Sequence, residues 1–250
     1  MKFGIVSDTH SNLHALKAVL EHMDSIGVDK KVHLGDIVGY GPKPSETLML
    51  TLEEFDYIVM GNHDLAVVDE ETAWGFNPQA RSAIEWTRDK LSKDEIDILS
   101  NIKYKQLVGG NILFSHGSTS AGNPFDYLIN HSDAKIAFAN ATVDFNVAFV
   151  GHTHVPVIWR EKDYTKPSYT QVHTNNTAFS MEIINSKSIV NVGSVGQPRN
   201  GDPRASYATY DTESKIVTLY KIPYPVDVTV ALMQREGFSR NSWERLLFGR

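Results

Sequence analysis

Hydrophobic residues along this chain fall into short runs that stop abruptly at glycine or polar residues. Five such runs have the length and the flanking turn residues of buried strands. They are residues 3–6, 31–34, 57–60, 111–114 and 146–150. Between them, apolar positions at helical spacing predict helices over 13–23 and 45–55, with Ser45 as the cap of the second. This alternation in the first third of the chain indicates parallel strands joined by right-handed crossovers.

Residues 65–105 are expected to leave the sheet as a helical excursion. Asn77 and Pro78 have the pattern that opens one amphipathic helix. Ser92 and Glu95 have the capping-box spacing that opens a second helix. This part of the chain is therefore predicted to be helical.

From residue 146 onward, strands dominate the pattern. Strands are predicted over 155–161, 170–173, 177–184 and 189–192, with a hairpin formed by 205–210 and 216–220. The remaining elements are helices over 133–141 and after Pro225, and a polar loop or irregular hairpin over 163–177. No repeat, low-complexity tract or flexible linker interrupts the 250 residues, so one compact α/β domain over 1–250 is expected.

The five apolar runs share one further property, which is that each ends beside a polar side chain able to bind a metal ion. These side chains are Asp8, His10, Asp36, Asn62, His63, Asp64, His116, His152 and His154. Ligands bind just beyond the carboxyl ends of strands in open sheets. Asp8 and His10 are two residues apart, as are His152 and His154, so each pair can face one side of an extended segment. The pattern therefore predicts one metal centre.

Composition limits the kind of metal and the kind of partner. The chain has no cysteine, and carboxylate, imidazole and amide donors favour manganese, iron or zinc over copper(I) or an iron–sulfur cluster. The net charge of −6 argues against a surface that coats nucleic acid. A nucleotide substrate stays possible, because bound cations supply local positive charge. No apolar stretch is long enough to span a bilayer, and the first strand begins at residue 3, so a cytoplasmic protein without a membrane partner is expected.

The order of these motifs resembles the calcineurin-like metallophosphoesterase superfamily. The motifs are Asp8-x-His10, Gly35-Asp36, Gly61-Asn62-His63-Asp64, His116 and Gly151-His152-x-His154. The resemblance implies a four-layer α-β-β-α sandwich, in which two mixed β-sheets are flanked by helices. It also implies two divalent metal ions, with manganese expected and iron or zinc as alternatives. One ion would be held by Asp8, His10 and His154, the other by Asn62, His116 and His152, and Asp36 would bridge them.

The resemblance also implies a hydrolytic mechanism. Paired cations lower the pKa of a bridging water and neutralise phosphate charge, so that a metal-bridging hydroxide attacks phosphorus. His63 is the candidate general acid, because it follows the ligand Asn62 and is not needed as a ligand itself. Asp64 would hold the His63 ring by a hydrogen bond and favour its protonated form.

Three segments, 35–44, 191–199 and 201–207, are similar to small bacterial and archaeal phosphodiesterases. The chain departs from protein serine/threonine phosphatases, which carry an Arg-Gly pair where this chain has Gly39-Tyr40-Gly41. Arg199 or Arg204 could supply the missing guanidinium to a phosphate, or each could pair with a carboxylate. Tyr40, beside the site, could stack on a base or only pack. Trp74 and Phe76 are expected to pack in a core or an interface rather than to bind a nucleoside.

Together these features predict hydrolysis of phosphodiester or phosphoanhydride bonds in a small phosphoester or nucleotide, including dinucleoside polyphosphates. One alternative is a phosphomonoesterase or phosphoprotein phosphatase. Another is a non-catalytic binding module on the same fold, which the retention of His63 and Asp64 disfavours. The sequence gives no indication of the oligomeric state.

Overall fold

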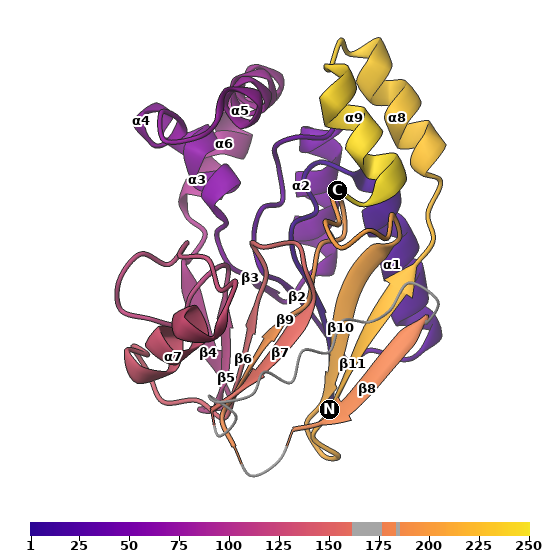
Figure 1. Cartoon of the computed structure of the whole chain (residues 1–250). Helices are drawn as coiled ribbons and strands as arrows, with labels where there is room; N and C mark the ends of the chain where they lie inside the picture. The colour runs from indigo at the N-terminus through magenta and orange to yellow at the C-terminus, as the bar shows by residue number, and fades with distance from the viewer. Residues whose placement is uncertain (162–176, 184–185) are drawn as a thin grey trace.

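The computed structural model describes residues 1–161, 177–183 and 186–250. The chain forms two mixed β-sheets that pack face to face (Figure 1). The first sheet has the order β3-β2-β1-β10-β11-β8 and the second has the order β4-β5-β6-β9-β7. The strands of the first sheet are β1 (Lys2–Val6), β2 (Lys30–His33), β3 (Tyr57–Ile58), β8 (Ala178–Glu182), β10 (Ala205–Asp211) and β11 (Ile216–Ile222). Those of the second are β4 (Lys105–Val108), β5 (Ile112–Ser115), β6 (Val147–Val150), β7 (Val157–Arg160) and β9 (Ser188–Asn191).

Parallel pairing, as predicted, joins the strands that precede the polar motifs. β1, β2 and β3 are parallel neighbours in the first sheet, and β5, β6 and β9 are parallel neighbours in the second. Because parallel strands end at the same edge of a sheet, the residues that follow them meet at one end of the sandwich.

The core lies between the two sheets. Alternate residues of β1 point to opposite faces, so Phe3 and Ile5 join the core between the sheets while Val6 packs against helix α1 (Leu13–Ser25). Helix α7 (His131–Ala139) covers the outer face of the second sheet. The predicted α-β-β-α layering of two mixed sheets flanked by helices is therefore confirmed.

Helices α2 to α6 include the predicted excursion. They are α2 (Pro44–Glu54), α3 (Asn62–Val68), α4 (Glu70–Ala73), α5 (Pro78–Lys90) and α6 (Lys93–Ser100). Asn77 caps α5 through the Ala80 N–H, and Ser92 forms the predicted capping box with Glu95. The prediction for α2 was wrong at its start, because Pro44 occupies the first turn and Lys43 is the N-cap. Ser45 instead donates a hydrogen bond to Glu95.

The C-terminal helices α8 (Val226–Arg235) and α9 (Arg240–Phe248) form a hairpin at the same end of the sandwich as α2 to α6 (Figure 1). The strand predicted over 170–173 and most of the segment 163–177 lie outside the described residues. Within the described part of the chain, every helix is too short or too polar to cross a lipid bilayer.

Candidate metal centre

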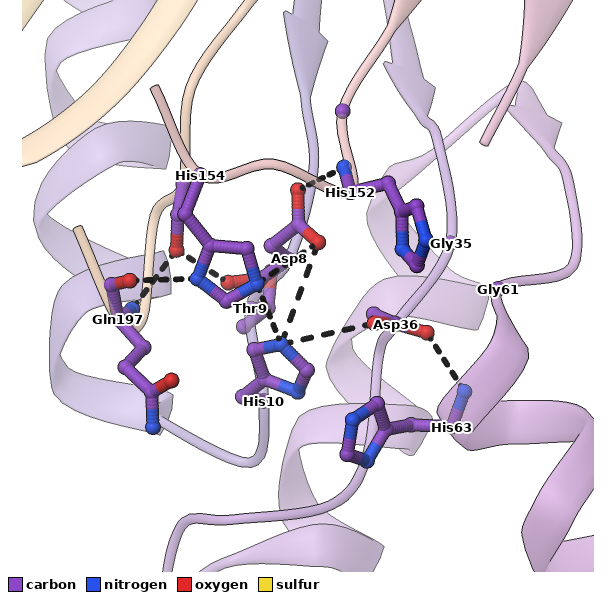
Figure 2. A network of polar contacts seen from close by, with 12 residues as sticks. Asp8, Thr9, His10, Gly35, Asp36, Gly61, His63, His152, His154 and Gln197 are labelled. Carbon is purple, nitrogen blue, oxygen red and sulfur yellow. Dashed lines mark hydrogen bonds and ion pairs between the residues drawn. The ribbon is translucent and has the colours of Figure 1, made fainter. Parts of the chain in front are cut away.

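A cluster of buried acidic and imidazole side chains lies at the end of the sandwich where the parallel strands stop (Figure 2). It consists of two groups whose potential ligand atoms lie within 4.8 Å of one another. The first group is Asp8, His10, Asp36 and His154, and the second is Asp36, His116 and His152. The Oδ1 atom of Asn62 lies 3.1 Å from Nε2 of His116, beside the second group. The structure thus brings together all the predicted ligands, with Asp36 shared as the resemblance implied.

The two sheets contribute opposite halves of this cluster. The first sheet supplies Asp8 and His10 after β1, and Asp36 after β2. The second sheet supplies His116 after β5, and the histidine pair of residues 152 and 154 after β6. The cluster therefore exists only when both sheets are formed and packed.

Tight backbone turns direct these side chains inward. Positive φ angles between 48° and 67° occur at Asp8, His10, Asp36, His152 and His154. Residues other than glycine rarely adopt a positive φ, and the backbone strain that it causes concentrates at functional sites. A Cβ atom at Gly151 would collide with the Ser7 and Asp8 side chains, so only glycine permits the close approach of the two strand ends.

The hydrogen bonds of three histidines leave a ring nitrogen facing the cluster. His10, His116 and His154 each donate their Nδ1–H to a main-chain oxygen. The acceptors are the carbonyls of Val38, Leu34 and Gln197, at 3.2, 2.8 and 2.6 Å respectively. Fixing the ring through its outer nitrogen is the arrangement of metal-ligating histidines.

The inner nitrogens and oxygens fit a cation better than they fit one another. Nε2 of His10 and Nε2 of His154 are 3.2 Å apart. Burial lowers the pKa of both rings, so both are neutral and two lone pairs face each other. Asp8 Oδ1 is buried and has no hydrogen-bond partner among the described residues, and His152 faces the cluster with Nδ1, which lies 3.1 Å from Nε2 of His116. These buried acceptors match the donor set of a divalent metal centre.

A comparison with known families agrees with this geometry. A family model for the calcineurin-like phosphoesterase superfamily domain matches residues 1–215. The chain belongs to this superfamily. Among the strands of the described residues, the match covers all but β11, and it contains all the clustered residues.

Individual relatives match over nearly the whole length. An uncharacterized protein of Methanocaldococcus jannaschii is 29% identical over 251 residues, which cover 99% of this chain and 98% of that protein. The crystal structure of a metallophosphoesterase from Sphaerobacter thermophilus has a TM-score of 0.87 at 35% identity and covers 100% of this chain and 99% of its own. A hypothetical protein from Pyrococcus horikoshii OT3 has a TM-score of 0.76 at 18% identity, covering 100% and 98%, and shows the same fold.

Without a metal ion, the negative charge of Asp36 is balanced by a proton on His116. Burial acts to raise the pKa of Asp36, but His116 and His63 hold it well below its usual range. Burial acts to lower the pKa of His116, but Asp36 outweighs it and raises this pKa to about 9. Below this pH, His116 is therefore a cation beside the Asp36 carboxylate, 3.4 Å away. Protonated His116 thus supplies the positive charge beside Asp36 that a bound metal ion would otherwise supply.

We expect metal binding to release this proton. His116 must lose its proton to act as a ligand, so metal affinity should rise with pH until about pH 9. In the metal-free protein the sign is opposite: the ion pair stabilises the fold below pH 6.5, and this contribution is lost as the pH rises through about 9. Manganese titrations by calorimetry at pH 7.5, in two buffers of different ionisation enthalpy, should show release of about one proton. Release of none would mean that His116 is neutral before metal binds.

The prediction that Asp64 holds the His63 ring by a hydrogen bond was wrong. The Asp64 carboxylate instead accepts main-chain N–H groups at 2.8 to 3.1 Å, which belong to Asp36, Ile37, Val38 and Gly61. The buried Nδ1 of His63 has no hydrogen-bond partner in the described part of the chain. Four N–H donors converge on Asp64, so its carboxylate is occupied in fixing the two motif loops to each other.

Packing, rather than a carboxylate, positions the His63 ring. Its centroid lies 4.5 Å from that of Tyr40, 4.8 Å from that of His10 and 5.0 Å from that of Phe76. Gly39 has a φ of +89°, and a Cβ there would lie 2.8 Å from Nδ1 of His63. Burial lowers the pKa of His63 to about 4, so the ring is neutral at pH 7.

A cavity of about 440 Å³ opens beside the cluster. Of the predicted substrate contacts, Asn62, Tyr40 and Arg199 line it, together with His63. Arg204 does not, because its guanidinium binds the Asp202 carboxylate at 2.7 Å. Phe76 packs against the cluster of Tyr40, Ala80 and Ala83, as expected, and also lines the cavity. Trp74 lies outside the cavity and is 66% exposed, so it does not pack in the core.

The loop between β5 and α7 carries site residues that sequence reasoning missed. Asn123, Phe125 and Tyr127 line the cavity. The Tyr127 ring stacks on His152 with centroids 3.8 Å apart and planes at 22°. No motif or periodicity marks this loop, because its residues approach the cluster only through the folding of the second sheet. The only available signal was three aromatic or amide side chains soon after His116.

Proposed function

We propose that this chain cleaves phosphodiester or phosphoanhydride bonds in small organic phosphates, with nucleotides and dinucleoside polyphosphates as the favoured substrates. It would bind two divalent ions, manganese foremost, with iron or zinc as alternatives. Asp8, His10 and His154 would hold one ion, Asn62, His116 and His152 the other, and Asp36 both.

The aromatic lining of the cavity is the observation that supports a substrate with an organic group on its phosphate. Tyr40 and Phe76 belong to the segments that follow β2 and α4, whereas Phe125 and Tyr127 belong to the loop that follows β5. Tyr127 is half exposed, with one face against His152. Aromatic faces beside a metal cluster favour a flat organic group on the scissile phosphate, since stacking contributes about 1–3 kcal/mol per base. The cavity volume is within the range of small-molecule sites.

Each part of the site then has a task. Two divalent ions, when bound, supply Lewis acidity and activate water for attack at phosphorus. Arg199 offers a guanidinium to a phosphate oxygen. His63 lies on the cavity wall, where it can give a proton to the departing oxygen. Because the pKa of His63 is lowered to about 4, a neighbouring phosphate charge would have to raise it, so protonation is coupled to substrate binding.

The role of His63 predicts a specific kinetic defect. His63→Ala should lower kcat by about 10²- to 10⁴-fold, the usual contribution of a general acid. Its metal content should stay at the wild-type level, because His63 belongs to neither ligand group. Steady-state kinetics and elemental analysis of the same preparation would test both statements. Loss of both metals in this variant would show that His63 is a ligand.

A paired assay tests the proposed substrate class. Protein loaded with manganese would be assayed with bis(p-nitrophenyl) phosphate, with p-nitrophenyl phosphate, and then with diadenosine tetraphosphate. We expect a higher kcat/KM for the diester or the tetraphosphate than for the monoester. A strong preference for the monoester would identify a phosphomonoesterase instead. No hydrolysis with any divalent metal would favour a binding module.

A further inference from the structure

Gln197 contacts both a predicted metal ligand and the arginine that lines the cavity. Its main-chain carbonyl accepts the Nδ1–H of His154 at 2.6 Å, while its side chain extends away from that ring (Figure 2). The side-chain oxygen Oε1 of Gln197 lies 2.7 Å from Nη2 of Arg199. Gln197 is only 2% exposed, so it makes these contacts inside the protein. It therefore links the metal cluster to Arg199.

The backbone at Gln197 is fixed by its neighbours. Its N–H donates to Ser194 Oγ at 2.8 Å, and the Ser194 hydroxyl donates in turn to the Asp8 carbonyl at 2.9 Å. Pro198 follows, and a proline fixes its own φ angle and restricts the conformation of the residue before it. The Gln197 side chain thus extends from a backbone whose position is set by the loops of the metal cluster.

The orientation of the Gln197 amide follows from the chemistry of arginine. A guanidinium has donors only, so the amide oxygen and not the NH₂ must face Arg199. Arg199 also donates its main-chain N–H to the His154 carbonyl at 3.3 Å. Its buried Nε has no hydrogen-bond partner among the described residues. The guanidinium is therefore held at one nitrogen and keeps donors for a further acceptor.

A neutral partner leaves the charge of an arginine available, whereas a carboxylate neutralises it. Arg204 forms an ion pair with Asp202 at 2.7 Å and does not line the cavity. Arg199 makes its contact at the same distance with an amide, and it does line the cavity. In the described part of the chain, no carboxylate oxygen lies within 4.0 Å of the Arg199 guanidinium. Gln197 thus holds Arg199 without neutralising it.

An arginine that is ordered beforehand binds an anion more tightly than a free one. Ordering a long side chain on binding costs conformational entropy, and a side chain that is already fixed avoids that cost. We propose that Gln197 is a positioning residue, which holds Arg199 so that its guanidinium can bind a phosphate oxygen of the substrate. Gln197 does not line the cavity itself, so it acts through Arg199. This inference rests on the proposed function, because it takes the anion at Arg199 to be a phosphoryl group.

The test measures the binding of inorganic phosphate by calorimetry, to protein loaded with manganese and freed of excess metal. Gln197→Met keeps the length of the side chain but removes its oxygen. We expect it to weaken phosphate binding by about tenfold, the effect of one lost hydrogen bond to a charged group. Its manganese content should stay at the wild-type level, because His154 binds the main chain of Gln197 and not its side chain. Gln234→Met, at an exposed glutamine of α8, is the matched control and should keep the wild-type phosphate affinity.

Two further variants separate positioning from a merely structural role. Gln197→Glu keeps an oxygen for Arg199 but neutralises its charge, so it too should weaken phosphate binding by about tenfold or more. In an Arg199→Gln background, Gln197→Met should have no further effect on phosphate binding, since the partner through which it acts is gone. Urea unfolding would identify a variant that does not fold, and Gln197→Glu supplies the same comparison should Gln197→Met be unfolded.

Several results would overturn the inference. They are wild-type phosphate affinity in either Gln197 variant, a loss of affinity that persists in the Arg199→Gln background, and loss of manganese from Gln197→Met. A wild-type protein that binds no phosphate would overturn it as well. The proposed function fails separately, if the wild-type protein binds phosphate but hydrolyses no phosphoester. The calorimetric comparison of the variants still decides the role of Gln197 in that case.

Discussion

Asp36→Asn is expected to lower kcat/KM by about 10³-fold or more and to remove at least one metal ion per chain. Asp36 is the residue shared by the two ligand groups, with Oδ2 at 3.6 Å from His10 Nε2 and 3.4 Å from His116 Nε2. An asparagine has the same shape but offers only one acceptor oxygen and no charge. Metal ions contribute several kcal/mol to phosphoryl-transfer rates, and each 1.36 kcal/mol is about tenfold.

Metal analysis and kinetics on the same Asp36→Asn sample would check this result. The control is Asp97→Asn, which changes an exposed aspartate on α6 and should leave metal content and rate at wild-type values. Wild-type rate with two ions in Asp36→Asn would show that the shared carboxylate is not needed as a bridge.

Asp64→Asn is expected to act on stability more than on chemistry. Asp64 Oδ1 accepts the N–H groups of Ile37 and Val38, and Oδ2 accepts those of Asp36 and Gly61. An amide NH₂ in place of one oxygen would face two buried donors. Each unpaired group costs about 1–3 kcal/mol, so the loss is about 2–6 kcal/mol of a total near 5–15 kcal/mol. Urea unfolding of metal-free protein should show a correspondingly lower midpoint.

A surface aspartate provides the comparison for Asp64. Asp69→Asn changes an exposed cap that accepts the Glu71 N–H at 3.1 Å, and it should cost about 1 kcal/mol or less. If Asp64→Asn unfolds at the wild-type urea concentration but has lost activity, then Asp64 serves His63 and not the backbone.

Local pattern sufficed to predict the sheets and the cluster, for one physical reason. The strands that precede the clustered residues are short, apolar and parallel, so their carboxyl ends lie together at one end of the sandwich. Asp8, Asp36 and His116 could therefore be grouped without knowing the loops between them. The capping box of Ser92 could likewise be predicted, since its atoms are close in sequence.

Features that depend on long-range contacts were missed or mistaken. Asp64 follows His63 directly, but the turn of α3 directs it to the backbone of the loop after β2. Tyr127 approaches His152 from a loop without regular pattern. The sequence alone does not show which of several possible partners each of these residues contacts.

The division of the cluster between two sheets has a consequence for synthesis on the ribosome. A nascent chain that has emerged only as far as residue 145 lacks both histidines that follow β6. It also lacks β10, the strand that pairs with β1 and stands between β1 and β11. Such a chain offers an incoming ion only a fragment of the coordination shell. Cofactor loading must therefore be one of the last events in the maturation of the polypeptide, after the C-terminal third has joined the fold.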